Sequence, residues 1–79
     1  MKTLMREIAT YNNCVFSMSL WGAYRKATGE YIVHVSYQEE QDGETLQKMY
    51  KLEGELKEVF KTYEAMIEVM KSKAKYREE

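Results

Sequence analysis

Apolar and polar residues alternate along the first half of the chain. Residues 14–24 and 30–38 each place an apolar side chain at every second position over most of their length. A period of two is typical of a β-strand with one buried face. Residues 3–11 fit either a strand or a short helix, and we favour a strand because a turn sequence follows them.

Two turn sequences connect these segments. Asn12-Asn13 tolerates the positive φ that a two-residue type I′ hairpin needs, and residues 26–29 end in glycine, as hairpin loops often do. With these turns, the registers of the two hairpins agree on which residues share one face of a three-stranded antiparallel meander. A slip of one residue in either register would remove this agreement. The predicted core face comprises Met5, Ala9, Tyr11, Cys14, Phe16, Met18, Leu20, Tyr24, Tyr31, Val33, Val35 and Tyr37.

One residue does not fit this face. Glu7 would place a charge on the core side of an edge strand. Inward charges protect sheet edges from pairing with other chains. The alternative is that residues 2–9 form a helix.

The opposite face of the predicted sheet is a candidate binding surface. The same register places Leu4, Trp21 and His34 in one row across the strands, with Ile32 beside them. Tryptophan is enriched among the residues that dominate binding energy at protein interfaces. Alternatively, the N-terminal segment or a second chain covers this face. A further candidate is the acidic stretch after the last strand, so the predicted partner-binding residues are Trp21, His34, Ile32, Glu39 and Glu40.

The spacing changes from Asp42 to Arg77. Apolar residues now recur at alternating intervals of three and four, which is the a/d pattern of a heptad, and Asp42 fits a helix N-cap. The series is Met49, Leu52, Leu56, Val59, Tyr63, Met66 and Met70. We therefore predict an α+β fold, with the sheet in residues 1–38 and one long helix over residues 42–77. A break in this helix near Gly54 is the alternative.

This helix is too long for its sheet. At 1.5 Å per residue, about 33 residues span roughly 50 Å, whereas a strand of about eight residues spans roughly 27 Å. The surplus apolar surface predicts a homodimer through a coiled-coil seam on the second half of the helix. The expected interface residues are Leu56, Val59, Phe60, Tyr63, Met66, Ile67 and Met70. The alternatives are a different protein on this surface, or a break near Gly54 that folds both halves over one sheet.

Composition narrows the function classes. The 79 residues form one expected domain with net charge −1, which gives no long-range attraction to nucleic acid or anionic lipid. A single cysteine permits no internal disulfide and fits a reducing compartment. No apolar run is long enough to span a membrane. We expect a cytoplasmic protein, or one in the host cytoplasm if a virus encodes it.

The chain carries no recognisable catalytic constellation. Its one histidine, His34, and its one cysteine, Cys14, fall on opposite faces of the predicted sheet. No metal-ligand spacing or glycine-rich phosphate loop occurs, so we expect neither an enzyme nor a bound cofactor or metal. The leading hypothesis is a non-catalytic protein-binding module of the accessory or inhibitor kind that phages and mobile elements encode. The alternative is a small nucleic-acid-binding regulator that uses the sheet face and the basic loop at Arg25 and Lys26.

Overall fold

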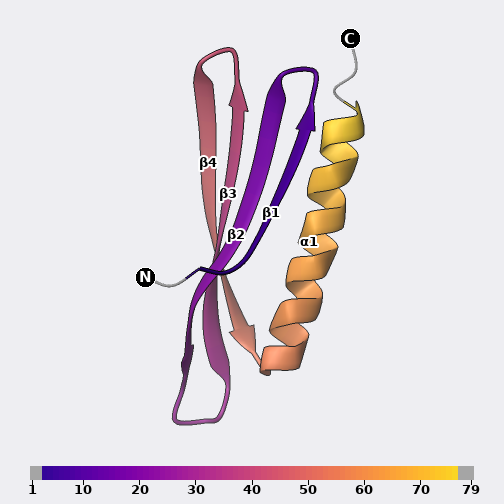
Figure 1. Ribbon diagram of the computed structural model, residues 1–79. Helices are drawn as coiled ribbons and strands as arrows, with labels where there is room; N and C mark the ends of the chain where they lie inside the picture. Colours follow the sequence, from indigo (N-terminus) through magenta and orange to yellow (C-terminus); the bar gives the residue numbers. More distant parts are fainter. Residues whose placement is uncertain (1–2, 77–79) are drawn as a thin grey trace.

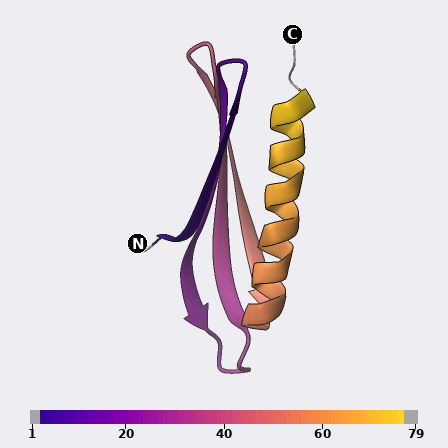
Figure 2. The same cartoon turned by 45° about the vertical axis from the view of Figure 1, so that its right-hand side comes forward.

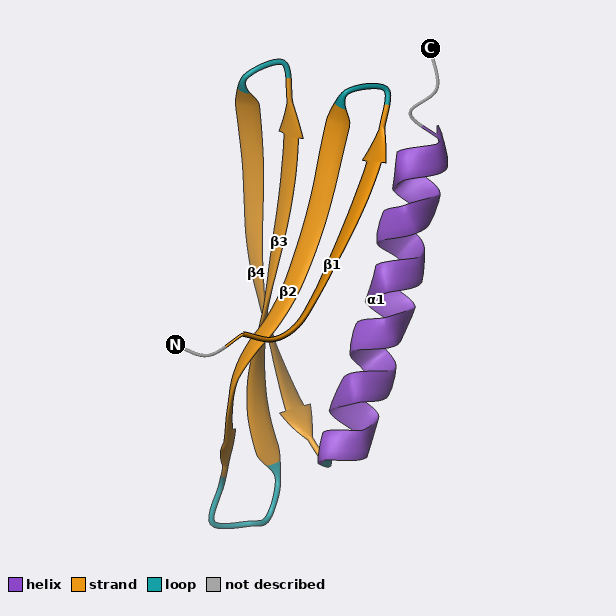
Figure 3. Ribbon diagram, viewed as in Figure 1, coloured by secondary structure: helices purple, strands orange, loops and turns teal. Residues whose placement is uncertain are grey.

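The protein consists of a four-stranded antiparallel sheet and one helix that packs on one face of this sheet (Figures 1 and 3). The computed structural model describes residues 3–76. The predicted α+β class is confirmed, but the predicted number of three strands is wrong. Residues 1–2 of the predicted sheet segment and Arg77 of the predicted helix lie outside the described residues. The elements are β1 (Thr3–Tyr11), β2 (Cys14–Arg25), β3 (Tyr31–Gln41), β4 (Glu44–Gly54) and α1 (Leu56–Tyr76), and the strand order is β1-β2-β3-β4.

The first hairpin has the predicted turn and register. Asn12 and Asn13 adopt φ values of 48° and 61°, which a type I′ turn requires. Tyr11 lies opposite Cys14, as the two-residue turn predicts. Residues 3–11 are therefore a strand and not a helix.

The second hairpin departs from the predicted register near its loop. Leu20 pairs with Val35 as predicted, but the register shifts between Trp21 and Tyr24, where Gly22 has a φ of 60°. A bulge inserts an extra residue and turns the following side chains to the other face. Tyr24 is consequently 55% exposed and does not belong to the predicted core face.

The largest difference from the prediction is that residues 44–54 form strand β4 instead of the start of a helix. Asp42 and Gly43 have φ values of 50° and 82°, and they connect Gln41 to its partner Glu44. Asp-Gly is a strong signal for a type I′ hairpin turn. The predicted helix N-cap at Asp42 is therefore wrong, because β3 offers this segment a ladder of backbone hydrogen bonds.

Helix α1 begins only after Gly54 and has 21 residues. Its length is about 32 Å at 1.5 Å per residue, whereas an eleven-residue strand reaches about 37 Å. The helix therefore fits along the sheet (Figure 2). The predicted surplus of helix, and the alternative of two helices separated at Gly54, are both wrong for the described chain.

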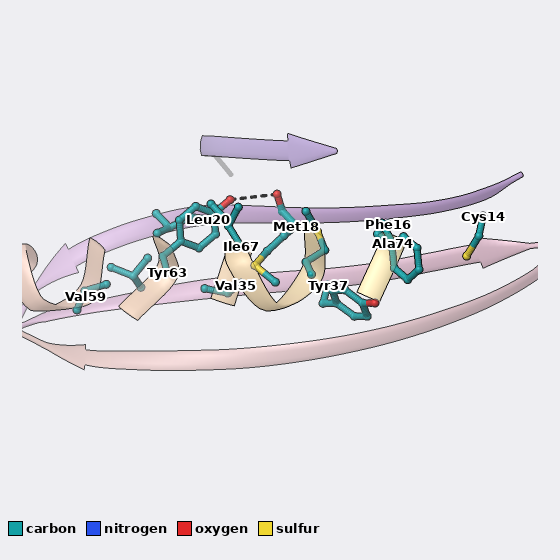
Figure 4. Close-up of a cluster of buried hydrophobic side chains, with 12 residues drawn as sticks. Cys14, Phe16, Met18, Leu20, Val35, Tyr37, Val59, Tyr63, Ile67 and Ala74 are labelled. Carbon is teal, nitrogen blue, oxygen red and sulfur yellow. Dashed lines mark hydrogen bonds between the residues drawn. The ribbon is translucent and has the colours of Figure 1, made fainter. Parts of the chain in front are cut away.

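The hydrophobic core lies between α1 and one face of the sheet (Figure 4). The apolar column of β2 is buried against α1, together with the matching positions of β3. Packing this face removes apolar surface from water, which is the main driving force of folding. The buried residues of this core are Cys14, Phe16, Met18, Leu20, Val33, Val35, Tyr37, Val59, Tyr63, Ile67, Met70 and Ala74.

The residues of the predicted dimer interface belong to this core. Val59, Tyr63, Ile67 and Met70 are at most 6% exposed, because the sheet of the same chain covers them. Leu56, Phe60 and Met66 are half-buried and pack against the same cluster. The apolar spacing that resembled a coiled-coil seam forms the face of α1 that packs on the sheet of the same chain. It therefore gives no support to a dimer through α1.

Tyr63 is the central buried side chain of α1. Its ring is fully buried, and its hydroxyl donates a hydrogen bond of 3.1 Å to the backbone oxygen of Met18 in β2 (Figure 4). Burial raises the pKa of Tyr63 above its ordinary value, and the negative charge of Glu7 adds to this rise. The folded state therefore favours the protonated phenol.

We predict that Tyr63→Phe lowers the free energy of unfolding at neutral pH by about 1 kcal/mol, the usual net value of one hydrogen bond. Because folding raises this pKa above 10.0, the stabilisation is fully present below that pH and is lost as the pH rises beyond it. Urea denaturation at neutral pH and near pH 10.5 measures both effects. Tyr24→Phe, at an exposed tyrosine, is the matched control. Equal alkaline losses in the wild type and Tyr63→Phe would contradict the prediction.

Candidate functional site on the outer sheet face

One face of the sheet is left uncovered by the rest of residues 3–76. Helix α1 packs on the other face, so the two faces have different surroundings (Figure 2). We call the uncovered side the outer face. By strand register, its central positions are Val15, Ser17, Ser19, Trp21, Ile32, His34, Ser36, Gln38, Gln47, Met49 and Lys51.

An aromatic pair stands on the outer face. Trp21 and His34 are direct partners across β2 and β3, and their rings stack with centroids 4.7 Å apart and an interplanar angle of 21°. The indole N–H donates a hydrogen bond of 2.7 Å to Ser36 Oγ, and the Ser36 hydroxyl donates to Met49 Sδ at 3.2 Å. These contacts hold the Trp21 ring in one orientation across three strands.

The neighbours of this pair differ in part from the prediction. Thr3 lies opposite Trp21, because the register of β1 shifts between Thr3 and Met5, so Leu4 is not the partner of Trp21. Ile32 is on the same face but only 9% exposed. Its side chain therefore offers little area for contact with a partner.

The two acidic residues of the predicted site are separated by the sheet. Both belong to β3, and successive strand residues point to opposite faces. Glu39 is buried on the helix side, where it accepts a hydrogen bond of 2.8 Å from the Tyr37 hydroxyl and lies 4.0 Å from Lys73. Glu40 is exposed and accepts a hydrogen bond from Gln38. Glu39 and Glu40 consequently do not form one contact surface.

Charges at the loop end of the outer face neutralise one another. Glu53 lies 3.1 Å from the Lys51 ammonium and 3.3 Å from the Lys26 ammonium. Lys51, followed by Lys26, holds the pKa of the Glu53 carboxyl below its ordinary value. Of the two basic residues in the loop that the nucleic-acid hypothesis invokes, Lys26 is therefore already paired.

Strand β4 contributes to this site, and its contribution was not predicted from the sequence. Met49 reaches Ser36 from β4, which was predicted to be helical. The Asp42-Gly43 turn is the signal that would have identified this strand. Ser36 itself carries no signal, since an isolated serine in a strand is common and its role depends on its cross-strand neighbours.

Residues 3–76 contain no group of three or more His, Cys, Asp or Glu side chains that could hold a metal ion. Cys14 is fully buried on the helix side, whereas His34 lies on the outer face. Within this part of the chain, no helix has the length and apolarity to cross a membrane.

Comparisons of the chain with protein-family models, curated proteins and solved structures found no match. The fold and the site therefore define the class of protein by themselves. It is a small α+β protein with a helix on one face of a four-stranded sheet and an aromatic pair on the other.

We predict that Ser36→Ala increases the local motion of Trp21, because the substitution removes the acceptor of the indole N–H. Trp21 is the single tryptophan of the chain, so its time-resolved fluorescence anisotropy reports on this site alone. Ser19→Ala, at the residue directly opposite Ser36, is the matched control. A faster anisotropy decay in Ser36→Ala only is expected, and equal decays in both variants would show that the hydrogen bond does not orient the ring.

Proposed function

We propose that this protein is a non-catalytic protein-binding module whose contact surface is the outer face around Trp21. The observation that carries the proposal is the fixed orientation of Trp21 on an uncovered face, between the His34 ring and the Ser36 hydroxyl. A tryptophan that is already ordered loses little conformational entropy when a partner binds it. Such side chains are the commonest binding hot spots.

The surroundings of Trp21 suit a protein interface. Met49 is 61% exposed and Ile8 is 54% exposed, so apolar contact area continues toward both edges of the sheet. Small hydroxyl side chains at Ser17 and Ser19 lie between them. An aromatic and apolar centre with a polar surround is the usual composition of such interfaces.

The charge of the outer face favours a protein over nucleic acid. The paired positions of this face carry two basic side chains, Arg6 and Lys51, and two acidic ones, Glu40 and Glu53. Nucleic-acid binding draws most of its affinity from basic side chains that neutralise phosphates. A balanced face gives no such attraction, although its aromatic pair resembles the stacking platforms of single-strand binders.

A module of this kind acts by occupying its partner's surface, as an accessory or inhibitor protein does. Viral or mobile-element origin and a cytoplasmic location stay predictions from the sequence. Neither is required for the contact surface that we propose.

We predict that Trp21→Ala weakens partner binding by about 30-fold, which corresponds to a hot-spot contribution of about 2 kcal/mol. The partner is first captured from the source cells with the tagged wild-type protein, and its affinity is then measured with purified components. Tyr76→Ala removes an aromatic side chain that is 87% exposed at the end of α1 and is the matched control. Equal affinities of the two variants would overturn the proposed surface.

The alternative function has its own test. We expect a single-stranded oligonucleotide to show no binding to the wild-type protein at low salt, because the outer face is electrically balanced. Fluorescence of Trp21 measures the binding directly. Quenching that weakens steeply with salt and is reduced by Arg6→Ala and Lys51→Ala would instead establish a nucleic-acid-binding regulator.

A further inference from the structure

The two edges of the sheet are protected to different degrees. Strand β1 has a register shift between Thr3 and Met5 and an inward-pointing Glu7, which lies 3.9 Å from Lys71 of α1. Bulges and inward charges are the usual devices that prevent a sheet edge from pairing with another chain. The β1 edge therefore carries two protective features.

Strand β4 is the open edge. It pairs with β3 without interruption from Glu44 to Gly54, so it has no bulge, and residues 44–51 are all exposed. The backbone groups on the free side of such a strand remain available for pairing. A long and regular edge is a template for a further antiparallel strand.

Apolar side chains accompany this edge. On β4, Leu46 and Tyr50 are 46% and 39% exposed on the helix side of the sheet, and Met49 is 61% exposed on the outer face. A groove of about 220 Å³ between β4 and α1 is lined by Tyr50, Met66 and Val69 among others. Val69 is itself 64% exposed, so apolar surface extends from the strand edge onto the helix.

We propose that β4 pairs with β4 of a second copy of this chain, antiparallel and about a two-fold axis through Met49. This inference goes beyond the proposed function and does not depend on it. The dimer has an eight-stranded sheet, with both helices on one face and both Trp21 residues on the other. Pairing over the whole of β4 would add about ten backbone hydrogen bonds.

The sequence of β4 is complementary to itself in this register. Because paired residues share a face, Leu46 meets the partner's Leu52, and Lys48 meets the ring of the partner's Tyr50. On the outer face, Gln47 meets the partner's Lys51. No like charges stand directly opposite each other. A register centred on Lys48 would instead place two ammonium groups face to face, so the charges favour Met49 as the centre.

Disulfide trapping tests the register. In this dimer the two Met49 Cα atoms are directly opposite, about 4.5–5.5 Å apart, which suits a disulfide. The two Thr45 Cα atoms would be about 27 Å apart along the strands. Met49→Cys should therefore form a covalent dimer with oxidised glutathione, whereas Thr45→Cys, on the same face of β4, should not. The native Cys14 is fully buried and does not interfere.

Charge variants test the same pairing without a cross-link. Gln47→Lys places a lysine opposite the partner's Lys51 at two symmetric points and should dissociate the dimer in sedimentation equilibrium. Adding Lys51→Glu to that variant should restore it, while circular dichroism confirms that all variants stay folded. A monomeric mass for the wild type at millimolar concentration, or equal cross-linking of Met49→Cys and Thr45→Cys, would overturn the proposal. A wild-type dimer that Gln47→Lys leaves intact would do the same.

Discussion

The packing of α1 on β2 is the contact on which the rest of the structure depends. Tyr63 stands at its centre, fully buried, with its hydroxyl donating to the Met18 backbone oxygen. Around it, one side of the helix meets the alternating apolar residues of the sheet. Since each strand exposes alternate residues to opposite sides, burying this face leaves the other one to solvent. The outer face is a candidate site because α1 packs on the opposite face of the sheet.

The arrangement of the outer face follows from cross-strand neighbours. Trp21 is oriented by His34 and Ser36, which belong to the next strand, and Ser36 is in turn linked to Met49 of the strand beyond. Each contact joins residues that are at least 13 positions apart in the chain. The site is therefore a product of register, and a shift of one residue would remove it.

The two edges of the sheet differ in how readily they can pair with a strand of another chain. The bulge in β1 and the inward-pointing Glu7 protect one edge, whereas β4 is continuous and exposed. Pairing through β4 would leave the Trp21 surface accessible, because the edge and the face of a sheet are separate surfaces. Association with a second copy and binding of a protein partner are then compatible, and a dimer would present two contact surfaces on one side.

Local sequence determined the first two strands and the Asn12-Asn13 turn, because a period of two and a two-residue turn fix the register of β1 against β2. The period of two also placed Trp21 and His34 on one face, although the register of β2 against β3 shifts after Trp21. Local sequence did not determine β4. Met49 and Leu52 match a helical spacing, yet in the strand they lie on opposite faces. The Asp42-Gly43 turn is a local signal for this strand, but the apolar spacing of the segment points to a helix. The tertiary structure decided between them, since the free edge of β3 supplied a ladder of backbone hydrogen bonds. Because residues 44–54 belong to the sheet, α1 begins only at Leu56 and is no longer than the strands. Its apolar face therefore packs on the sheet as part of the core and does not extend beyond it as a dimer seam.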